Sequence, residues 1–379
     1  MKSPKSLTTI ATWSKLNEEN SLRNFVALVV LVFSTVGFCF AADNPYGLIL
    51  QNEFAKRYKS EVEPYWSSNA TVSTFASADD RLQLSYAKLL TPKAKGVVVI
   101  SNGRTETYLK YKELAFDLAR TGYSVYIHDH RGQGMSPRLQ PDPGEHDKGH
   151  VDQFDDYVED MRAFVLKVVR PEQPPQVKFF LLGHSMGGGI ATRYLQKYPD
   201  TFAAAALSSP MLEPNAKIFV SAQSSCWWFK NTSWLCPTCY AGFLSKPYQQ
   251  TAGTKKDYTH SDERWEEVLR VFATNPSAKL GGPTRRWAAE ACASSNPMLE
   301  QAGDVRTPVL LLQAGDDQAV VPDAQNAFCE KLKAATGKTC NGPGGGPLKI
   351  PDAAHELFIE ADQYRVPALT AILDFFSKH

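Results

Sequence analysis

A serine set between glycines at the end of an apolar run is the residue of this chain best placed for chemistry. Residues 179–189 read Phe-Phe-Leu-Leu-Gly-His-Ser-Met-Gly-Gly-Gly, which puts Ser185 at the centre of Gly183-x-Ser185-x-Gly187. The apolar run predicts a buried strand, and residues 190–198 predict a helix. A serine on such a tight strand-to-helix turn is exposed as a nucleophile, and only glycine fits where strand and helix nearly collide. The pattern therefore predicts Ser185 as a catalytic nucleophile.

A serine hydroxyl becomes a good nucleophile only when a base accepts its proton. Three histidines follow Ser185 in the chain: His260, His355 and His379. His260 lies in a polar stretch and His379 is the last residue, whereas His355 follows the short predicted strand 348–350. Loops at the carboxyl ends of parallel strands are where an open α/β sheet keeps its active site. His355 is therefore predicted to be the base.

The base needs a carboxylate that fixes its tautomer. The apolar run Val309–Gln313 leads into Ala-Gly-Asp-Asp, which offers two adjacent candidates, Asp316 and Asp317. Asp317 is favoured because it lies one step further into the turn, and Asp316 remains the alternative. The resulting chain order of serine, acid and histidine is that of hydrolases built on a parallel sheet.

A tetrahedral intermediate also needs two backbone donors for its oxyanion. One is predicted to be the N–H of Met186, directly after the nucleophile. The other is assigned to the N–H of Arg104, in the loop after the predicted strand 96–100, where Gly103 permits close approach of the backbone. This chemistry requires no metal and no organic cofactor.

The elements that would hold these loops alternate between strand and helix. Alternation predicts a mostly parallel, doubly wound α/β sheet. The predicted strands are residues 82–90, 96–100, 123–128, 177–182, 203–207, 308–313 and 348–350, and the predicted helices are 108–121, 154–169 and 366–377. Residues 44–77 are expected to form a partly helical lead-in. The hydrolase core then comprises residues 43–210 and 305–379.

Residues 211–304 interrupt this alternation and are rich in aromatic residues and cysteines. An insertion between two core strands predicts a cap domain over the active site. Its aromatic residues could shelter an acyl chain, contact a membrane, or form the small core of the cap itself. The strongest candidates for contact with an acyl chain or a membrane are Trp227, Trp228 and Phe229, because three consecutive aromatic residues cannot all face the core of the cap.

The N-terminal 42 residues resemble an export signal. Residues 25–42 are almost entirely apolar and follow a stretch with several basic residues. The segment is predicted to be a cleaved signal peptide or an uncleaved membrane anchor, with the body outside the cytoplasm at the cell envelope.

Apart from Cys39 there are six cysteines, and an even number favours disulfides. Cys329 and Cys340 are the expected pair, and the other four are expected to cross-link the middle region.

Several of these motifs together resemble the α/β-hydrolase superfamily, within the subgroup of bacterial lysophospholipases and monoacylglycerol lipases that is also called serine aminopeptidase-like. The resemblance rests on six segments spread over residues 80–379: 102–104, 129–136, 149–151, 183–188, 310–317 and 354–356. It implies an ester hydrolase that removes the acyl chain of a lysophospholipid or another monoacyl lipid. Many relatives have His-Gly where this chain has Asn102-Gly103, and the cysteine-rich cap also differs. Because the cap shapes the acyl pocket, the resemblance does not fix which lipid this chain prefers.

The composition of the chain limits the kinds of partner that it is expected to bind. The 41 basic and 40 acidic residues nearly cancel, and no basic stripe is interleaved with aromatics, so nucleic acid is not an expected partner. A monoacyl lipid substrate and a membrane surface are expected, and the oligomeric state is left open. An alternative of another class is a hydrolase-fold lipid-binding protein with an idle triad. A covalent probe for active serines distinguishes the two.

Overall fold

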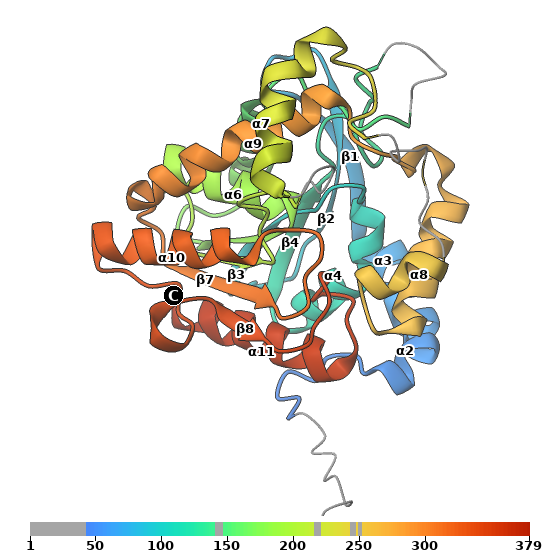
Figure 1. The fold of residues 1–379 in the computed structure, drawn as a ribbon. Helices are drawn as coiled ribbons and strands as arrows, with labels where there is room; N and C mark the ends of the chain where they lie inside the picture. The colour runs from blue at the N-terminus through green and yellow to red at the C-terminus, as the bar shows by residue number, and fades with distance from the viewer. Residues whose placement is uncertain (1–42, 141–146, 216–220, 243–247, 249–251) are drawn as a thin grey trace, which may run out of the picture. The chain divides into compact units, whose positions relative to one another are not determined.

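One eight-stranded sheet organises the chain. The structure, a computed structural model, describes residues 43–140, 147–215, 221–242, 248 and 252–379. The strands are β1 (Ala70–Ala76), β2 (Gln83–Leu89), β3 (Gly96–Ser101), β4 (Tyr123–His128), β5 (Phe179–His184), β6 (Ala204–Ser208), β7 (Val309–Ala314) and β8 (Leu348–Ile350). They lie in the order β1-β2-β4-β3-β5-β6-β7-β8, and only the β1–β2 and β2–β4 pairs are antiparallel. The predicted doubly wound α/β fold is confirmed (Figure 1).

Helices cover both faces of this sheet. The α-helices are α2 (Gln51–Arg57), α3 (Glu63–Asn69), α4 (Lys112–Arg120), α5 (Asp155–Phe164), α6 (Met186–Lys197), α7 (Ala222–Thr232), α8 (Asp262–Thr274), α9 (Arg285–Glu300), α10 (Pro322–Thr336) and α11 (Asp362–Lys378). Shorter 3-10 or π-helical turns are η1 (Tyr58–Val62), η2 (Tyr108–Tyr111), η4 (Val165–Val169), η5 (Arg170–Glu172), η6 (Ser233–Leu235), η7 (Ala252–Asp257), η8 (Pro276–Ala278), η9 (Ala302–Asp304) and η10 (Pro343–Gly345).

Alternate residues of the central strands enter two different cores. In β3, Val97 and Val99 pack with α5, α6 and α10, whereas Val98 and Ile100 pack with α4 and α11. Successive side chains of a strand point to opposite faces, so a strand covered on both faces must be apolar throughout. This is why β3 carries an unbroken apolar run, and why the carboxyl edge of the sheet is left as the place for polar loops.

The predicted strands are all present, with ends that differ by a residue or two. β1 was not predicted, and the expectation of a partly helical lead-in as far as Ser77 is wrong at its end. β1 is an edge strand with four consecutive exposed residues, and Phe75 is its one buried residue. An edge strand that buries so little does not show the apolar signature of the central strands. The predicted helix over 154–169 is present, but its second half is the π-helical turn η4.

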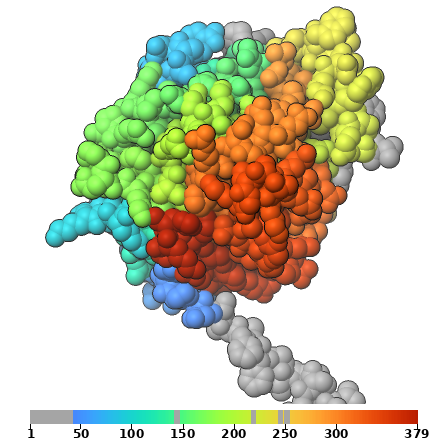
Figure 2. All heavy atoms as spheres, turned by 90° about the vertical axis from the view of Figure 1, so that its left-hand side faces the viewer, coloured from blue at the N-terminus to red at the C-terminus, as the bar shows by residue number. Residues whose placement is uncertain are grey.

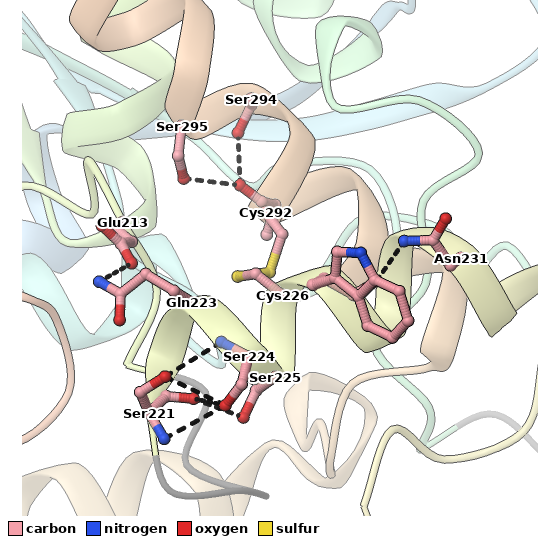
Figure 3. The surroundings of a disulfide bond; sticks show 12 residues. Glu213, Ser221, Gln223, Ser224, Ser225, Cys226, Asn231, Cys292, Ser294 and Ser295 are labelled. Atoms are coloured by element: carbon pink, nitrogen blue, oxygen red, sulfur yellow. Dashed lines mark hydrogen bonds between the residues drawn. A yellow bond between two sulfur atoms is a disulfide. The ribbon is translucent and has the colours of Figure 1, made fainter.

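The segment predicted as a cap lies between the neighbouring strands β6 and β7 and contains α7, α8 and α9. Cys226 of α7 is paired with Cys292 of α9, so the two helices are joined side by side (Figure 3). In Figure 2, α7 (yellow) stands at the margin of the molecule with α9 (orange) beside it. The structure also pairs Cys236 with Cys239, and Cys329 with Cys340. The oxidation of these cysteines and the boundaries of the cap stay predictions.

The start of the folded body is fastened to residues that come much later in the chain. The carbonyl oxygen of Ile49 accepts hydrogen bonds from the guanidinium groups of Arg264 in α8 and Arg365 in α11. The N–H of Gln51 donates to Asp362 at 2.7 Å. The segment that precedes β1 is therefore held by the cap and by the last helix together.

The predicted export segment, residues 1–42, lies outside the described residues, as does Cys39. Within the described part of the chain, every helix is too short or too polar to cross a bilayer.

Candidate active site

Ser185 occupies a strained turn between β5 and α6. Its backbone has φ 51° and ψ −122°, a positive φ that non-glycine residues rarely adopt. A Cβ atom on Gly187 would lie 2.1 Å from the carbonyl oxygen of Ser101, and one on Gly183 would lie 2.9 Å from the Cα atom of Gly188. No side chain fits at either position, which explains the two glycines that flank the serine. The turn lifts Ser185 above the carboxyl edge of the sheet.

The structure brings Ser185, His355 and Asp317 together. The hydroxyl of Ser185 donates to Nε2 of His355 at 2.8 Å, and Nδ1 of His355 donates to Oδ2 of Asp317 at 2.7 Å. Ser185 follows β5, Asp317 follows β7 and His355 follows β8, so the carboxyl ends of three strands at one edge of the sheet supply the three residues, with β6 between the first two strands. Asp316, the alternative acid, instead accepts a hydrogen bond from Gln318. The arrangement is that of a nucleophile, a base and a carboxylate that orients the base.

The electrostatics of the pair strengthen this arrangement. Burial disfavours a charged imidazole, but the negative charge and hydrogen bond of Asp317 outweigh it and raise the pKa of His355 above its ordinary value. Burial would also raise the pKa of Asp317, yet His355 and the backbone N–H groups of Ala319 and Val320 lower it. Asp317 therefore stays ionised and stabilises a positive charge on His355.

The two residues predicted to form the oxyanion hole flank the serine. Met186 is the first residue of α6, so its N–H has no acceptor within the helix. Arg104 lies in the turn after β3 and lines the same cavity as Ser185. That these two backbone N–H groups bind the oxyanion stays a prediction.

A buried charge network beneath that turn was not foreseen from the sequence. Glu106 accepts hydrogen bonds from the N–H of Gly103 and from the side chains of Lys110 and Tyr111. Lys110 also donates to Glu356 at 2.7 Å, and Glu356 directly follows His355, the base, in the chain. The ammonium group of Lys110 thus joins the oxyanion turn to the histidine loop. Glu106–Lys110 is an (i, i+4) pair, the one sequence signal that could have suggested the contact.

His184 belongs to the same region. Its Nδ1 donates to the carbonyl oxygen of Ser208 at 3.2 Å, and its Nε2 lies 3.3 Å from the carboxylate of Glu356. Glu106, His184 and Glu356 are close enough to offer ligands to one metal ion. Lys110 already bonds both carboxylates, however, and its positive charge opposes a cation at that place. The geometry favours a structural role for His184.

Asp129 supports the oxyanion turn from the other side. Its carboxylate accepts from the side chains of Asn102 and Thr107 and from the N–H groups of Tyr108 and Met135. Burial raises the pKa of Asp129 to about 7, although these hydrogen bonds oppose the rise. The segment 129–136, one of the six on which the family resemblance rests, therefore supports the loop after β3.

A cavity of about 360 Å³ opens beside Ser185. Its core side is polar and is formed by the turn after β3, the serine elbow and the histidine loop. Its cap side is largely apolar and includes Phe229, Ala241, Trp287 and Ala288. A pocket of this size with an apolar wall and a few polar groups suits an acyl chain attached to a small polar head.

The fold and the site together define an α/β-hydrolase with a serine nucleophile. The chain matches the family described as serine aminopeptidase, S33, over residues 92–362. It is 37% identical over 333 residues to lysophospholipase L2 of Escherichia coli (strain K12), which covers 87% of this chain and 94% of that protein. The probable lysophospholipase L2 of Haemophilus influenzae is 30% identical over 320 residues, 84% of this chain and 95% of that protein.

Among solved structures, a soluble variant of monoglyceride lipase from Saccharomyces cerevisiae, in complex with a substrate analogue, aligns with a TM-score of 0.63. The alignment covers 82% of this chain and 94% of that chain at 18% sequence identity, so the likeness is one of fold. The chain belongs to the S33 serine aminopeptidase family, and the resemblance inferred from its motifs is confirmed.

Proposed function

We propose that this protein is a lysophospholipase, which hydrolyses the acyl ester of a monoacyl phospholipid. The observation that carries the proposal is the hydrogen-bonded chain from Ser185 through His355 to Asp317 at the mouth of a cavity with an apolar wall. The lysophospholipase L2 relatives, similar over nearly their whole length, support the choice of lipid class.

Each residue of the site has one part in the proposed reaction. The oxygen of Ser185 attacks the ester carbonyl carbon while His355 accepts its proton, and the N–H groups of Arg104 and Met186 stabilise the oxyanion. His355 then returns the proton to the glycerol oxygen, which leaves an acyl-serine. A water molecule, activated by the same imidazole, releases the fatty acid. Asp317 holds the imidazole throughout.

The test is the release of fatty acid from a lysophospholipid by residues 43–379, measured beside a monoacylglycerol with the same acyl chain. Ser185→Ala should lower kcat on both substrates by about 10⁶-fold, because the nucleophile is lost. Its thermal unfolding should match that of the wild-type protein. Faster cleavage of the monoacylglycerol would leave the triad intact but would assign the enzyme to the monoacylglycerol lipases. No difference between wild type and Ser185→Ala would contradict the hydrolase proposal.

We propose further that the cap contacts the membrane from which the substrate comes. Three exposed apolar side chains lie on α7 and η6: Trp227, Trp234 and Leu235 are 66%, 72% and 62% exposed. Phe229, two residues beyond Trp227 on the same helix, is buried. The helix therefore turns Trp227 to solvent and Phe229 to the interior. Lys230 is exposed on the same helix. Tryptophan beside a basic residue suits the interface of an anionic bilayer.

Sedimentation with vesicles of phosphatidylethanolamine and phosphatidylglycerol tests this surface. The double variant Trp227→Ser/Trp234→Ser should bind the vesicles several-fold more weakly, because tryptophan prefers the membrane interface. Val72→Ser/Leu166→Ser is the matched control, since these two apolar side chains are exposed elsewhere on the molecule. Equal binding by both double variants would contradict the proposal.

For localisation, we propose a cell-envelope protein that is exported by residues 1–42. The apolar stretch with its basic flank and the paired cysteines support this proposal. Sequencing the N-terminus of the protein from envelope fractions distinguishes a cleaved signal from a retained anchor. Recovery of the full-length protein in the cytoplasm would contradict both.

A further inference from the structure

Arg104 places a charged side chain, as well as a backbone amide, at the cavity. Its guanidinium group donates to the hydroxyl of Thr105 at 3.1 Å and to the carbonyl oxygen of Gly281 in the cap at 2.5 Å. The Nε atom has no acceptor among the described residues. A guanidinium carries five N–H donors, so most of its hydrogen-bonding capacity is left for another partner.

Among the described residues, the charge of Arg104 is also unmatched. The buried guanidinium groups of Arg131, Arg264 and Arg365 each pair with a carboxylate, for example Arg264 with Glu113 at 3.1 Å. No ion pair is found for Arg104 within the described part of the chain, where the ionisable groups that act on its charge are tyrosines. Burial lowers the pKa of Arg104 to about 10, which still leaves it a cation at neutral pH.

Burying a cation without a counter-ion costs free energy, and this cost is offset when the ligand brings an anion. The surroundings of Arg104 also fix its position. Its guanidinium lies 5.1 Å from the ring centre of Trp287, a cation–π contact, and passes close to Gly149, where a Cβ atom would lie 2.7 Å from Nη2. The side chain is thus held in place by the cap, beside the cavity that Arg104 lines and without a carboxylate partner among the described residues.

We propose that the guanidinium group of Arg104 binds the phosphate of the substrate head group and so makes the enzyme prefer phospholipids to neutral monoacyl esters. This inference rests on the proposed function and adds the residue that reads the head group. Arginine suits the task because its planar fork matches phosphate oxygens and is always charged.

The covalent spacing of the substrate agrees with this assignment. In a lysophospholipid acylated at the terminal glycerol carbon, the ester carbonyl carbon and the phosphorus atom are separated by the same number of covalent bonds as the backbone nitrogen and Cζ of an arginine. The N–H of Arg104 is assigned to the carbonyl oxygen at one end. Its guanidinium group can therefore reach the phosphate at the other end, so that one residue spans the polar part of the lipid.

The experiment compares kcat/KM for a lysophosphatidylethanolamine and for a monoacylglycerol with the same acyl chain. Arg104→Gln should lower the ratio of the two values by about tenfold to a hundredfold, the range expected for lost hydrogen bonds to a charged group. The ratio cancels any change that affects both substrates, such as a shift of the oxyanion turn. Arg104→Lys, which keeps a point charge, should lose less of the ratio.

Arg138→Gln is the matched control. Arg138 also joins a core turn to the same part of the cap, through the carbonyl oxygens of Ser277 and Lys279, but it does not line the cavity. Its removal should leave the ratio unchanged. An unchanged ratio in Arg104→Gln, or an equal fall in Arg138→Gln, would overturn the inference.

A second readout separates this inference from the proposed function. Glycerophosphoethanolamine, which has the head group but no acyl chain, should inhibit hydrolysis of a neutral soluble ester by the wild-type enzyme. It should inhibit Arg104→Gln several-fold less. This comparison holds even if lysophospholipids prove to be poor substrates, which would count against the proposed function alone. Equal inhibition of both proteins, or none, would overturn the phosphate site.

Discussion

The core and the cap form opposite walls of the same cavity and hold their residues in place differently. On the core side, buried charges are matched to one another: Lys110 bonds Glu106 and Glu356, and Asp317 bonds His355. On the cap side, apolar residues such as Phe229 and Trp287 line the cavity, and the pair of Cys226 and Cys292 links α7 to α9.

This difference separates two tasks. Matched buried charges fix atoms within a fraction of an ångström, as proton transfer requires, and they fail badly when one partner is lost. Apolar contacts tolerate a change of shape with only modest loss. We therefore expect variants of the core to change the chemical step or the stability of the fold, and variants of the cap to change which lipid is accepted.

After loss of the nucleophile itself, the largest effect should come from the acid of the triad. Asp317→Asn should lower kcat by about 10⁴-fold, because His355 would be held in the wrong tautomer. Asp316→Asn, its neighbour, should change kcat by less than a few-fold, since the side chain of Asp316 bonds only Gln318 among the described residues. Steady-state kinetics on a lysophospholipid measures both. A larger loss in Asp316→Asn would reverse the assignment.

Removing the central cation of the core should affect stability. Lys110→Met leaves Glu106 and Glu356 buried without their shared partner, at a cost of about 3–5 kcal/mol in the free energy of unfolding. Lys197→Met breaks a pair with Glu159 at the surface and should cost about 0–1 kcal/mol. Chemical denaturation monitored by circular dichroism measures both. Similar costs would show that the buried network does not stabilise the core.

The cap should respond differently. Cys226→Ala/Cys292→Ala removes the cross-link between α7 and α9 and should lower the free energy of unfolding by about 2–4 kcal/mol. Hydrolysis of a short soluble ester should change little, whereas hydrolysis of a long-chain lysophospholipid should fall, because the apolar wall is loosened. Wild-type protein under reducing conditions serves as the control. Equal losses on both esters would remove the distinction between the two walls.

The smallest expected effect is a shift of the pH profile. Only neutral His355 can accept the proton of Ser185, and the pKa of His355 lies above its ordinary value of 6.5. The inactive protonated form therefore persists to higher pH, so kcat/KM should rise with pH through an apparent pKa above 6.5. The cysteine double variant of the cap should give the same apparent pKa. An inflection below 6.5 would contradict the electrostatics of the core.

The sequence predicted those parts of the molecule whose signals are local. The central strands are apolar runs, and Ser185, Asp317 and His355 stand directly after such runs, so their positions at one edge of the sheet followed from topology. β1 was missed because an exposed edge strand carries no such run. The interpretation of Trp227 to Phe229 was limited to stating that they could not all face one way.

The contacts that tune the site could not be predicted, because they join residues far apart in the chain. Lys110 meets Glu356 across 246 residues, and Arg104 meets Gly281 across 177. From the sequence, Arg104 was assigned only for its backbone amide. Its side chain has no carboxylate partner among the residues that the structure describes, which depends on the folded surroundings and could not be predicted from a local pattern.

The carbonyl oxygen of Ile49, bonded by Arg264 and Arg365, has a consequence for the order in which the body is completed. A chain that is synthesised or threaded from its N-terminus delivers Ile49 first and Arg365 almost last. The two bonds that hold the segment before α2 can therefore form only after α8 and then α11 have been made, so this part of the fold is completed late although its residues come early in the chain.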